Sequence, residues 1–495
     1  MTDRHAATTP RMRTIAEHRV DPASAVVYEH GWQSWSPAGV HRVTGSSPRP
    51  GKPRWQTMAY RPETPAPATG FQGEGLLALQ VAADAPVLVF HSPEPRREVA
   101  SIRLEVVDGG PAVSGAGGVG TAVGGRSELP VTVRVSADGE VAVTEHATDL
   151  VTALEEHAEA LAHHLGVPDG GTTRAVGTGW CSWYGYYHDV TEQVMRDELA
   201  LIDRQGLAVD TVQLDDGYQT GIGDWLTRRT DTFPAPLSEL AARIAETGRS
   251  AGIWTAPFLV GADSDLARAH TDWLVGAAEA SDHHWGQRIG VLDVTHPDAA
   301  EHLQEVFATL TGWGFSYHKI DFLYAGALPG RRREDVTPLE AYGRGLELIR
   351  EAIGEASVLL GCGAPLLPSI GRVDAMRISP DIDASFEPPL GDVSQPSGRG
   401  AVLMGRARAF QHGRWWVNDP DCLMLRPGVE RRELWARDLA AHGALAVSGD
   451  PIAALDEQGL AWTRALLQPP AARAGRWAAD PDDDLGGALS PRPLA

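Results

Sequence analysis

One rhythm repeats along the second half of the sequence: a short apolar run, a polar turn and an amphipathic helical pattern. Apolar runs that alternate with helical patterns are typical of parallel strands joined by crossover helices. Eight such units in about 275 residues match the size of a (βα)8 barrel. The strands that we predict are 176–183, 211–215, 251–256, 316–321, 358–362, 374–378, 414–418 and 443–448.

A ninth apolar run, Arg288–Val294, does not fit an eightfold repeat, and we interpret it as an insertion after the third strand. A doubly wound open sheet is the competing architecture, but it would place a glycine-rich phosphate loop after the first strand, where none is found. We therefore predict an α/β fold with a TIM barrel. Asp189 with Glu192 and Thr337 with Glu340 have the spacing of capping boxes at two of its helices.

The first 145 residues have the alternating pattern of short strands separated by loops rich in proline and glycine. Val131–Val135 and Glu140–Val143 flank Asp138-Gly139, a sequence that favours a β-hairpin. We predict an antiparallel β-sandwich, followed by a helix within 146–165. The expected domains are 1–166 for the sandwich with its linking helix, 167–452 for the barrel, and 453–495 for a short C-terminal region, either a reduced β-domain or a partly disordered tail.

The composition restricts the kinds of partner. A formal charge of −22 repels nucleic-acid backbones and anionic membranes, which favours a neutral small molecule as partner. Three cysteines are too few for a disulfide framework and lack metal-binding spacing. The first twenty residues have no apolar segment, and no run of about 18 apolar residues follows. We expect a cytoplasmic protein that needs no metal and no cofactor, and its oligomeric state stays open.

Polar and aromatic residues follow the predicted strands. Because the carboxyl ends of barrel strands meet at one face, these residues should form one site. All but two of the 43 basic residues are arginine, yet one of the two lysines, Lys319, falls there, as does the only asparagine, Asn418. The strand ends are Trp180–Tyr184, Asp215–Gly217, Trp254–Phe258, Lys319–Asp321, Gly361–Gly363, Arg377–Asp381 and Asn418–Asp421.

These residue types suit the chemistry of sugars. Tryptophan faces pack on pyranose rings, and carboxylates bind hydroxyl groups, as we expect of Asp215 and Asp216. Cleavage of a glycosidic bond requires one ionised and one protonated carboxyl group. Asp321 suits the ionised role because Lys319, two residues earlier on the same strand face, brings a positive charge. Asp381, across the barrel, suits the acid.

Three other readings of these residues stay open. Lys319 could form a Schiff base in an aldolase-like barrel. Asp215, Asp216, Asp321 and Asp419 could bind Mg²⁺ or Ca²⁺ in a metal-dependent hydrolase. The chain could also bind a sugar without turning it over.

The motifs, in their order along the chain, resemble those of the α-galactosidases (melibiases) of glycoside hydrolase family 36. The resemblance covers about residues 176–426, and Gly31–Trp35 is similar to part of that family's N-terminal β-sandwich. The motifs that carry it are Gly179–Tyr184, Gln213–Gly217, Gly223–Trp225, Gly252–Phe258, His318–Phe322, Leu360–Gly363, Met376–Asp381 and Trp416–Cys422.

The resemblance implies a retaining double displacement on terminal α-linked galactose of oligosaccharides such as melibiose and raffinose. It implies Asp321 as nucleophile and Asp381 as general acid/base. An α-galactosyl transglycosylase and an α-N-acetylgalactosaminidase on the same scaffold stay open. Ser379 stands where the family usually has glycine, and Asp383 is an additional carboxylate. The residues that the resemblance implies for substrate binding are Trp35, Trp183, Asp215, Asp216, Trp254, Lys319, Cys362 and Arg377.

Overall fold

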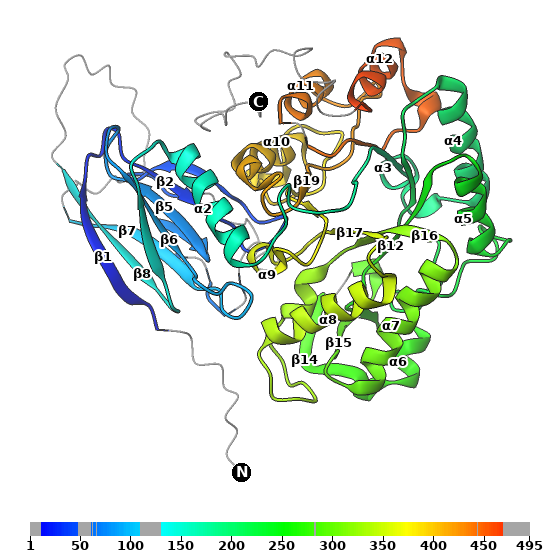
Figure 1. Cartoon of the computed structure of the whole chain (residues 1–495), viewed down its shortest axis with the longest axis horizontal. Coiled ribbons are helices and arrows are strands. Elements are labelled where there is room, and N and C mark those ends of the chain that lie inside the picture. The colour runs from blue at the N-terminus through cyan, green and yellow to red at the C-terminus, as the bar shows by residue number, and fades with distance from the viewer. Residues whose placement is uncertain are drawn as a thin grey trace.

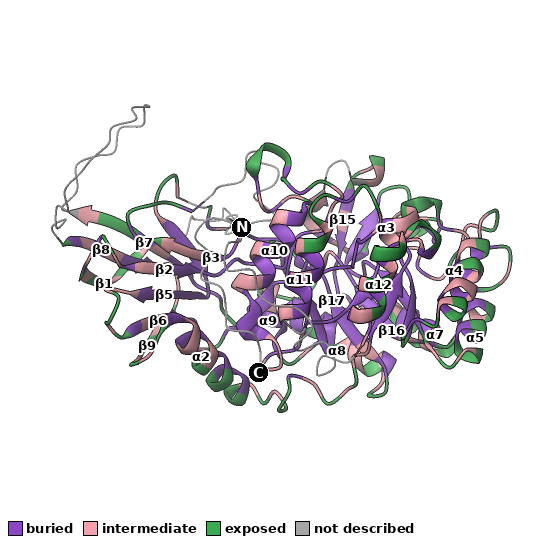
Figure 2. Ribbon diagram, turned by 90° about the horizontal axis from the view of Figure 1, so that it is seen from above, coloured by how far each residue is buried: buried purple, intermediate pink, exposed green. Residues whose placement is uncertain are grey.

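The computed structural model describes residues 11–47, 61, 63–65, 67–108, 130–281, 284–442 and 444–468. Two parts lie side by side in Figure 1, an N-terminal pair of β-sheets and a parallel barrel, with helix α2 (Leu150–His164) running along the sheets. In Figure 2 the barrel strands are mostly buried, whereas the outer sides of helices such as α4 (Glu192–Gln205) are exposed. This distribution is expected of a barrel whose helices form an outer ring.

The barrel sheet contains eight parallel strands. Segments next to its end strands β19 and β20 bring the two ends of the sheet together. The Leu445 amide, before β20, donates to the carbonyl of Asn418 in β19 (2.9 Å), and Leu423, after β19, forms a parallel bridge with Ser448 of β20, so the sheet curls around on itself. All eight predicted strands are confirmed, most of them shorter than expected. In sheet order they are β20 (Val447–Ser448), β10 (Gly179–Cys181), β11 (Thr211–Leu214), β12 (Ser250–Thr255), β16 (Phe315–Ile320), β17 (Val358–Gly361), β18 (Ala375–Arg377) and β19 (Val417–Asp419).

Helices connect these strands. The capping box at Thr337 is confirmed, since its side chain accepts from the Glu340 amide and Glu340 accepts in return. The predicted cap at Asp189 is wrong: Asp189 ends a short 3-10 turn, and the cap of α4 is Thr191, whose side chain accepts from the Val194 amide. The helices of the barrel are α3 (Trp183–Tyr186), α4, α5 (Leu237–Glu246), α6 (Asp265–Ala269), α7 (Pro297–Gly312), α8 (Pro338–Ile353), α9 (Leu366–Ser369), α10 (Gly398–Ala407) and α11 (Arg432–His442).

The ninth apolar run belongs to a small antiparallel sheet inserted between β12 and β16. It consists of β13 (Leu259–Gly261), β15 (Ile289–Leu292) and β14 (Leu274–Ser281). The interpretation of residues 288–294 as an insertion after the third strand is therefore confirmed. The insertion also brings Trp285 to the mouth of the barrel, which matters for the site described below.

The N-terminal part is a sandwich of two antiparallel sheets, as predicted. Side chains of both sheets, such as Phe71, Phe90 and Val133, are fully buried between them. One sheet has the order β1 (Arg13–Val20), β8 (Val131–Ala137), β7 (Ser101–Asp108) and β4 (Phe71–Glu74). The other has the order β3 (Gly39–Arg42), β2 (Val26–Glu29), β5 (Leu76–Gln80), β6 (Val87–His91) and β9 (Ala142–His146).

The predicted hairpin around Asp138-Gly139 is wrong, because β8 and β9 belong to different sheets. Strand β8 pairs with β1 and β7, whereas β9 pairs with β6. Asp138 does not close a tight turn. Its carboxylate accepts from the Ser101 amide (2.7 Å) and from Arg61 (2.5 Å), and the chain then crosses to the other sheet.

Helix α2 confirms the predicted linking helix and bonds to the barrel. The Trp415 indole donates to the Ala158 carbonyl (3.1 Å), and Arg414 pairs with Glu159 (3.1 Å). The domain limits at 166/167 and 452/453 stay predictions. The described part of the C-terminal region contains helix α12 (Glu457–Leu466), and residues 469–495, where the tail is predicted, lie outside the described residues. Within the described ranges, no helix is both long and apolar enough to span a membrane.

Candidate active site

A cavity of about 260 Å³ opens at the carboxyl ends of the barrel strands. This volume lies below the roughly 300–1,000 Å³ of typical ligand pockets, which suits a ligand of monosaccharide size. Aromatic rings and charged groups share its wall. The lining residues are Trp35, Trp183, His188, Asp215, Asp216, Trp254, Trp285, Lys319, Asp321, Phe322, Arg377 and Asp381.

A larger cavity, about 390 Å³, lies among residues that precede strands β10, β17 and β18, at the opposite end of the barrel. Its arginines already have partners: Arg174 and Arg350 both pair with Asp374, at 2.8 and 2.6 Å. The smaller cavity is the candidate active site because barrel enzymes carry their catalytic groups at the carboxyl ends of strands.

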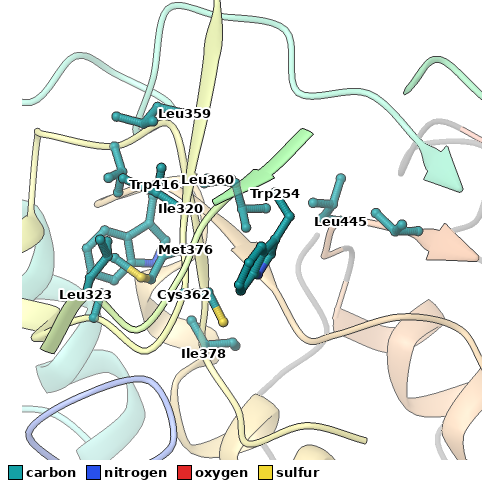
Figure 3. Close-up of a cluster of buried hydrophobic side chains, with 14 of the residues drawn as sticks. Trp254, Ile320, Leu323, Leu359, Leu360, Cys362, Met376, Ile378, Trp416 and Leu445 are labelled. Carbon is teal, nitrogen blue, oxygen red and sulfur yellow. The ribbon is translucent and has the colours of Figure 1, made fainter. Parts of the chain in front are cut away.

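Nine of the ten residues predicted for the site line the smaller cavity, and Cys362 does not. Cys362 follows β17 and is fully buried. Figure 3 shows its sulfur in an apolar cluster with Trp254, Met376 and Ile378. Burial, followed by the charge of Asp321, raises the pKa of its thiol well above the ordinary value. Cys362 therefore packs as a small apolar residue behind the cavity wall.

Lys319 pairs directly with Asp215, at 2.9 Å from Nζ to Oδ2. The sequence suggested Asp321 as its partner. Burial opposes the charge of Lys319, but the carboxylates of Asp215 and Asp321 outweigh it and hold the lysine pKa well above its ordinary value. The ammonium is therefore protonated at neutral pH and contributes a fixed positive charge beside both carboxylates.

Asp321 comes directly after β16 and is only 7% exposed. Its Oδ2 accepts from the Trp254 indole (3.1 Å) and its Oδ1 from the Phe322 amide (2.7 Å), so both oxygens are oriented. Phe322 has a left-handed backbone (φ 52°), which is uncommon for an aromatic residue and characteristic of functional sites. The Phe322 ring lines the cavity beside Asp321.

Asp381 is the more open carboxylate, with 38% of its side chain exposed. It accepts from Arg377 (2.7 Å), which is buried and also donates to Asp421 (2.5 Å). Tyr184 donates to the same oxygen of Asp421, Oδ2. Burial raises the pKa of Asp421 to about 7, although Arg377 opposes this effect. Arg377 thus holds Asp381 from a buried network behind the cavity.

The two departures from the family pattern lie outside the cavity lining. Asp383 accepts from the Ser385 amide (2.8 Å), and the buried Ser379 donates to the Pro420 carbonyl (2.9 Å). Asp381, and not Asp383, is therefore the carboxylate of this loop that lines the cavity.

Asp216 accepts three hydrogen bonds, from Gln219 (2.5 Å), His188 (2.9 Å) and Trp285 (2.9 Å). Burial opposes its ionisation, but these bonds outweigh it and lower the pKa of Asp216. The same contact raises the pKa of His188. The negative charge of Asp216 is thus paired with a histidine whose charge depends on pH.

Sequence reasoning missed three lining residues, His188, Trp285 and Phe322. His188 and Phe322 lie in the loops after the first and fourth predicted strands, so their position was a usable signal. Trp285 comes from the insertion after the third strand, about thirty residues beyond that strand's end, where no local pattern points to the site.

The two rare residues have different surroundings. Lys319 lines the cavity, whereas Asn418 does not. The Asn418 amide donates to the Arg408 carbonyl (3.0 Å), and its oxygen accepts from the Trp416 indole (3.0 Å). The other lysine, Lys52, lies outside the described residues. In the part of the chain that the structure describes, no group of three or more His, Cys, Asp or Glu side chains is arranged to hold a metal ion.

Comparison with known proteins gives matches to α-galactosidases. Residues 179–327 match the family model described as Melibiase. The bifunctional alpha-galactosidase/sucrose kinase AgaSK of Mediterraneibacter gnavus is 37% identical over 101 residues, 19% of this chain and 10% of that protein. Alpha-galactosidase AgaA of Geobacillus stearothermophilus is 26% identical over 170 residues, 31% of this chain and 22% of that protein. The matched segments thus span about a fifth or less of these relatives' length.

Solved structures match over most of the chain. TtGalA, an alpha-galactosidase from Thermus thermophilus in complex with stachyose, is 26% identical with a TM-score of 0.71, covering 92% of this chain and 94% of that one. The GH36 alpha-galactosidase AgaA from Geobacillus stearothermophilus shares the fold at 15% identity and a TM-score of 0.59, covering 91% of this chain and 61% of that one. The resemblance found in the motifs is thus confirmed: residues 179–327 match the Melibiase family model, and the chain is similar in sequence and in fold to α-galactosidases, among them structures of glycoside hydrolase family 36.

Proposed function

We propose that the chain is a retaining α-galactosidase that hydrolyses terminal α-linked galactose from oligosaccharides of the melibiose and raffinose type. The observation that carries this proposal is the pair Asp321 and Asp381, which reach one monosaccharide-sized cavity from strands β16 and β18. The solved structures of TtGalA with stachyose and of AgaA variants with raffinose and stachyose support the substrate class.

The reaction that we propose has two steps. Asp321 attacks the anomeric carbon while Asp381 gives its proton to the leaving oxygen, so the glycosidic bond breaks and a galactosyl ester forms. Water then attacks the same carbon, Asp381 takes its proton, and Asp321 leaves. Each step inverts the anomeric centre, so the product keeps the α-configuration.

The surroundings of the two carboxylates suit these roles. Asp321 is buried and held by two N–H donors, as a nucleophile that must point at one atom requires. Asp381 is more open, so a leaving group and then a water can reach it. The pair of Lys319 and Asp215 offers a donor and an acceptor to sugar hydroxyls, and the tryptophans of the wall offer apolar faces to the ring.

The rival use of Lys319 as a Schiff-base nucleophile is disfavoured by its environment. A lysine that forms an imine must be neutral to attack a carbonyl, and its pKa is usually lowered for that purpose. Here Asp215 and Asp321 do the opposite and hold the ammonium in its charged form.

The purified protein should release p-nitrophenol from p-nitrophenyl α-galactoside and not from the β-anomer. The galactose released should be the α-anomer when it is observed early by proton NMR, and a β-anomer first product would contradict retention. Turnover of the β-galactoside in place of the α-galactoside would contradict the proposal altogether.

A second candidate is an α-N-acetylgalactosaminidase. A relative named A type blood alpha-D-galactosamine galactosaminidase, from Flavonifractor plautii, is 28% identical over 204 residues, 40% of this chain and 18% of that protein. The p-nitrophenyl α-N-acetylgalactosaminide, assayed in parallel, separates the two candidates. Adding lactose as an acceptor then measures how far transfer competes with hydrolysis.

A cytoplasmic location stays a prediction, to be checked by cell fractionation.

A further inference from the structure

Trp35 belongs to the N-terminal part of the chain, yet its indole lines the cavity of the barrel. It is 94% buried, since its exposed fraction is 6%, and its ring packs edge-on against Phe322 at 5.1 Å. Among the described residues, its indole N–H has no hydrogen-bond acceptor. No side-chain hydrogen bond therefore orients the indole, and besides its ring contacts the position of Trp35 depends on what holds the backbone of its loop, residues 31–36.

Part of the loop is bonded to the segment that follows β17. The Ser34 amide donates to the Ala364 carbonyl (3.1 Å), and the Leu366 amide donates to the Trp32 carbonyl (3.0 Å). A Cβ at Gly363, whose φ is 53°, would lie 2.8 Å from the Trp35 ring. These contacts hold one side of the loop.

The other side of the loop is held by Arg408, which caps the C-terminus of α10 and is fully buried. Figure 1 shows α10 on the side of the barrel that faces the sandwich. Nη1 of Arg408 donates to the carbonyls of Ser34 and Ile378, both at 2.6 Å. Its Nη2 donates to the carbonyls of Ser36 (2.7 Å) and Gln33 (3.3 Å).

Three of these four acceptors flank Trp35 in sequence, and the fourth, Ile378, follows Arg377, which bonds Asp381. One side chain thus joins the backbone around Trp35 to the strand end that carries the proposed acid. A planar guanidinium with five donors can do this, whereas an ammonium on a flexible stem offers three.

Arg408 pairs with no carboxylate within the described part of the chain, and its guanidinium donates to the four carbonyls instead. Burial lowers its pKa to about 10, so the side chain stays charged at neutral pH. A buried charge without a counter-ion is unfavourable unless its hydrogen bonds are well placed. The four carbonyls supply those bonds, and they do so only while the loop keeps this conformation.

Asn418 and Gly31 both constrain the contact between Arg408 and the 31–36 loop. Asn418, the only asparagine of the chain, donates to the Arg408 carbonyl (3.0 Å) and so fixes the backbone from which the guanidinium extends. A Cβ at Gly31 would lie 2.5 Å from the Pro37 carbonyl oxygen and 2.9 Å from Nη2 of Arg408. The glycine of the Gly31–Trp35 motif therefore allows the loop to close over Arg408.

We propose that Arg408 is a positioning residue, which holds the Gln33–Ser36 backbone on the barrel and thereby places Trp35 in the substrate cavity. The identity of the ligand that Trp35 contacts rests on the proposed α-galactosidase function. The placement of Trp35 by Arg408 does not.

A double-mutant cycle tests this coupling. Arg408→Lys should lower kcat/KM for p-nitrophenyl α-galactoside roughly 10- to 100-fold, because a misplaced contact group costs about this much. Trp35→Ala should have a loss of similar size. If Arg408 acts through Trp35, adding Arg408→Lys to Trp35→Ala should lower kcat/KM by no more than about threefold further. Losses that multiply in the double variant would overturn the proposal.

Arg414→Met is the matched control. Arg414 also joins the barrel to the N-terminal part, through Glu159 (3.1 Å) and Glu155 (3.6 Å) of α2, but it has no recorded bond to the 31–36 loop. Its kcat/KM should stay within about twofold of the wild type, since partly exposed ion pairs contribute little. Gly31→Ala displaces the loop from the opposite side and replaces Arg408→Lys in the cycle if that variant does not fold. It should lower kcat/KM by a similar factor, and adding it to Trp35→Ala should cause little further loss.

Near-ultraviolet circular dichroism provides a readout that needs no turnover. The bands that disappear in Trp35→Ala belong to Trp35 in its fixed environment. Arg408→Lys, folded by its far-ultraviolet spectrum, should lose the same bands, and Arg414→Met should keep them. Should the wild type hydrolyse no α-galactoside, the proposed function fails while this spectrum still decides the inference. Persistence of the Trp35 bands in folded Arg408→Lys overturns it.

Discussion

Asp321 and Asp381 share one cavity but have unlike surroundings. Asp321 is almost completely buried and accepts from two neutral N–H groups, with Lys319 and Asp215 paired nearby. Asp381 is more than a third exposed and accepts from one arginine, which a buried aspartate, Asp421, holds from behind. Asp321 is thus held in one orientation, whereas Asp381 is accessible and is bonded by Arg377 alone. This difference suits a nucleophile on one side of the sugar and a proton donor on the other.

Asp321→Asn should give the largest loss. The amide keeps the shape of the side chain but cannot form the galactosyl ester, so kcat should fall on the order of 10⁴-fold or more. Steady-state release of p-nitrophenol measures this, with thermal denaturation as the check on folding. Activity within tenfold of the wild type would remove Asp321 from the nucleophile role and end the contrast drawn above.

Asp381→Ala should give a loss that depends on the leaving group. When an oligosaccharide such as raffinose is cleaved, the sugar that departs is a poor leaving group and needs a proton. For these substrates kcat/KM should therefore fall roughly 10²- to 10⁴-fold. Activated aryl galactosides should lose much less. Equal losses on both would show that Asp381 is not the proton donor. Asp383→Ala is the matched control, and it should leave both substrates nearly unaffected because Asp383 does not line the cavity.

Lys319→Met should reduce stability as well as activity. Removing the ammonium leaves the Asp215 carboxylate buried without its ionic partner, which typically lowers the free energy of unfolding by about 3–5 kcal/mol. Urea denaturation measures this. Asp215→Asn in the same background should recover part of the loss, because the uncompensated charge is then removed. A single variant as stable as the wild type would mean that the two side chains are not coupled.

The smallest expected effect concerns His188 at the rim. Its pKa is raised by Asp216, so the pair contributes stability at pH values below 6.5, the ordinary value for histidine, and loses it as the pH rises through the raised pKa. Because half of the His188 side chain is exposed, the effect should be below about 1 kcal/mol. His188→Gln should therefore flatten the change in unfolding free energy between about pH 5.5 and about pH 8.5. If His188→Gln leaves the pH dependence of the unfolding free energy unaltered, another titrating group causes it.

The barrel was predictable because its signals are local. Each strand is a short apolar run, and the residue that follows it points to the rim of the barrel; this is why the sequence pattern was enough to select Asp215, Asp321 and Asp381. Cys362 shows the limit of the same rule. It also follows a strand, but its side chain turns into the apolar cluster behind the wall.

Contacts between distant segments were not predictable. Asp138-Gly139 has the composition of a hairpin turn, yet β8 pairs with β1 and β7 in one sheet and β9 pairs with β6 in the other. Lys319 and Asp321 are two residues apart on one strand, but Lys319 pairs with Asp215 on another. Local sequence specifies which face a side chain occupies and not which group it meets there.

The sequence alone determined the eight-stranded barrel, the N-terminal sandwich, and most of the polar residues of the cavity. Continuous apolar runs mark the buried strands of a parallel barrel, alternation of apolar and polar residues marks the strands of the sandwich, and the polar residues of the cavity follow the barrel strands along the chain. Only the tertiary structure decided that Trp285 reaches Asp216 from an insertion and that Arg408 bonds the loop of Trp35. These contacts join residues up to 375 positions apart in the sequence. They form only when the packed sheets and helices bring such segments together, and no periodic pattern within one segment indicates which other segment it will contact.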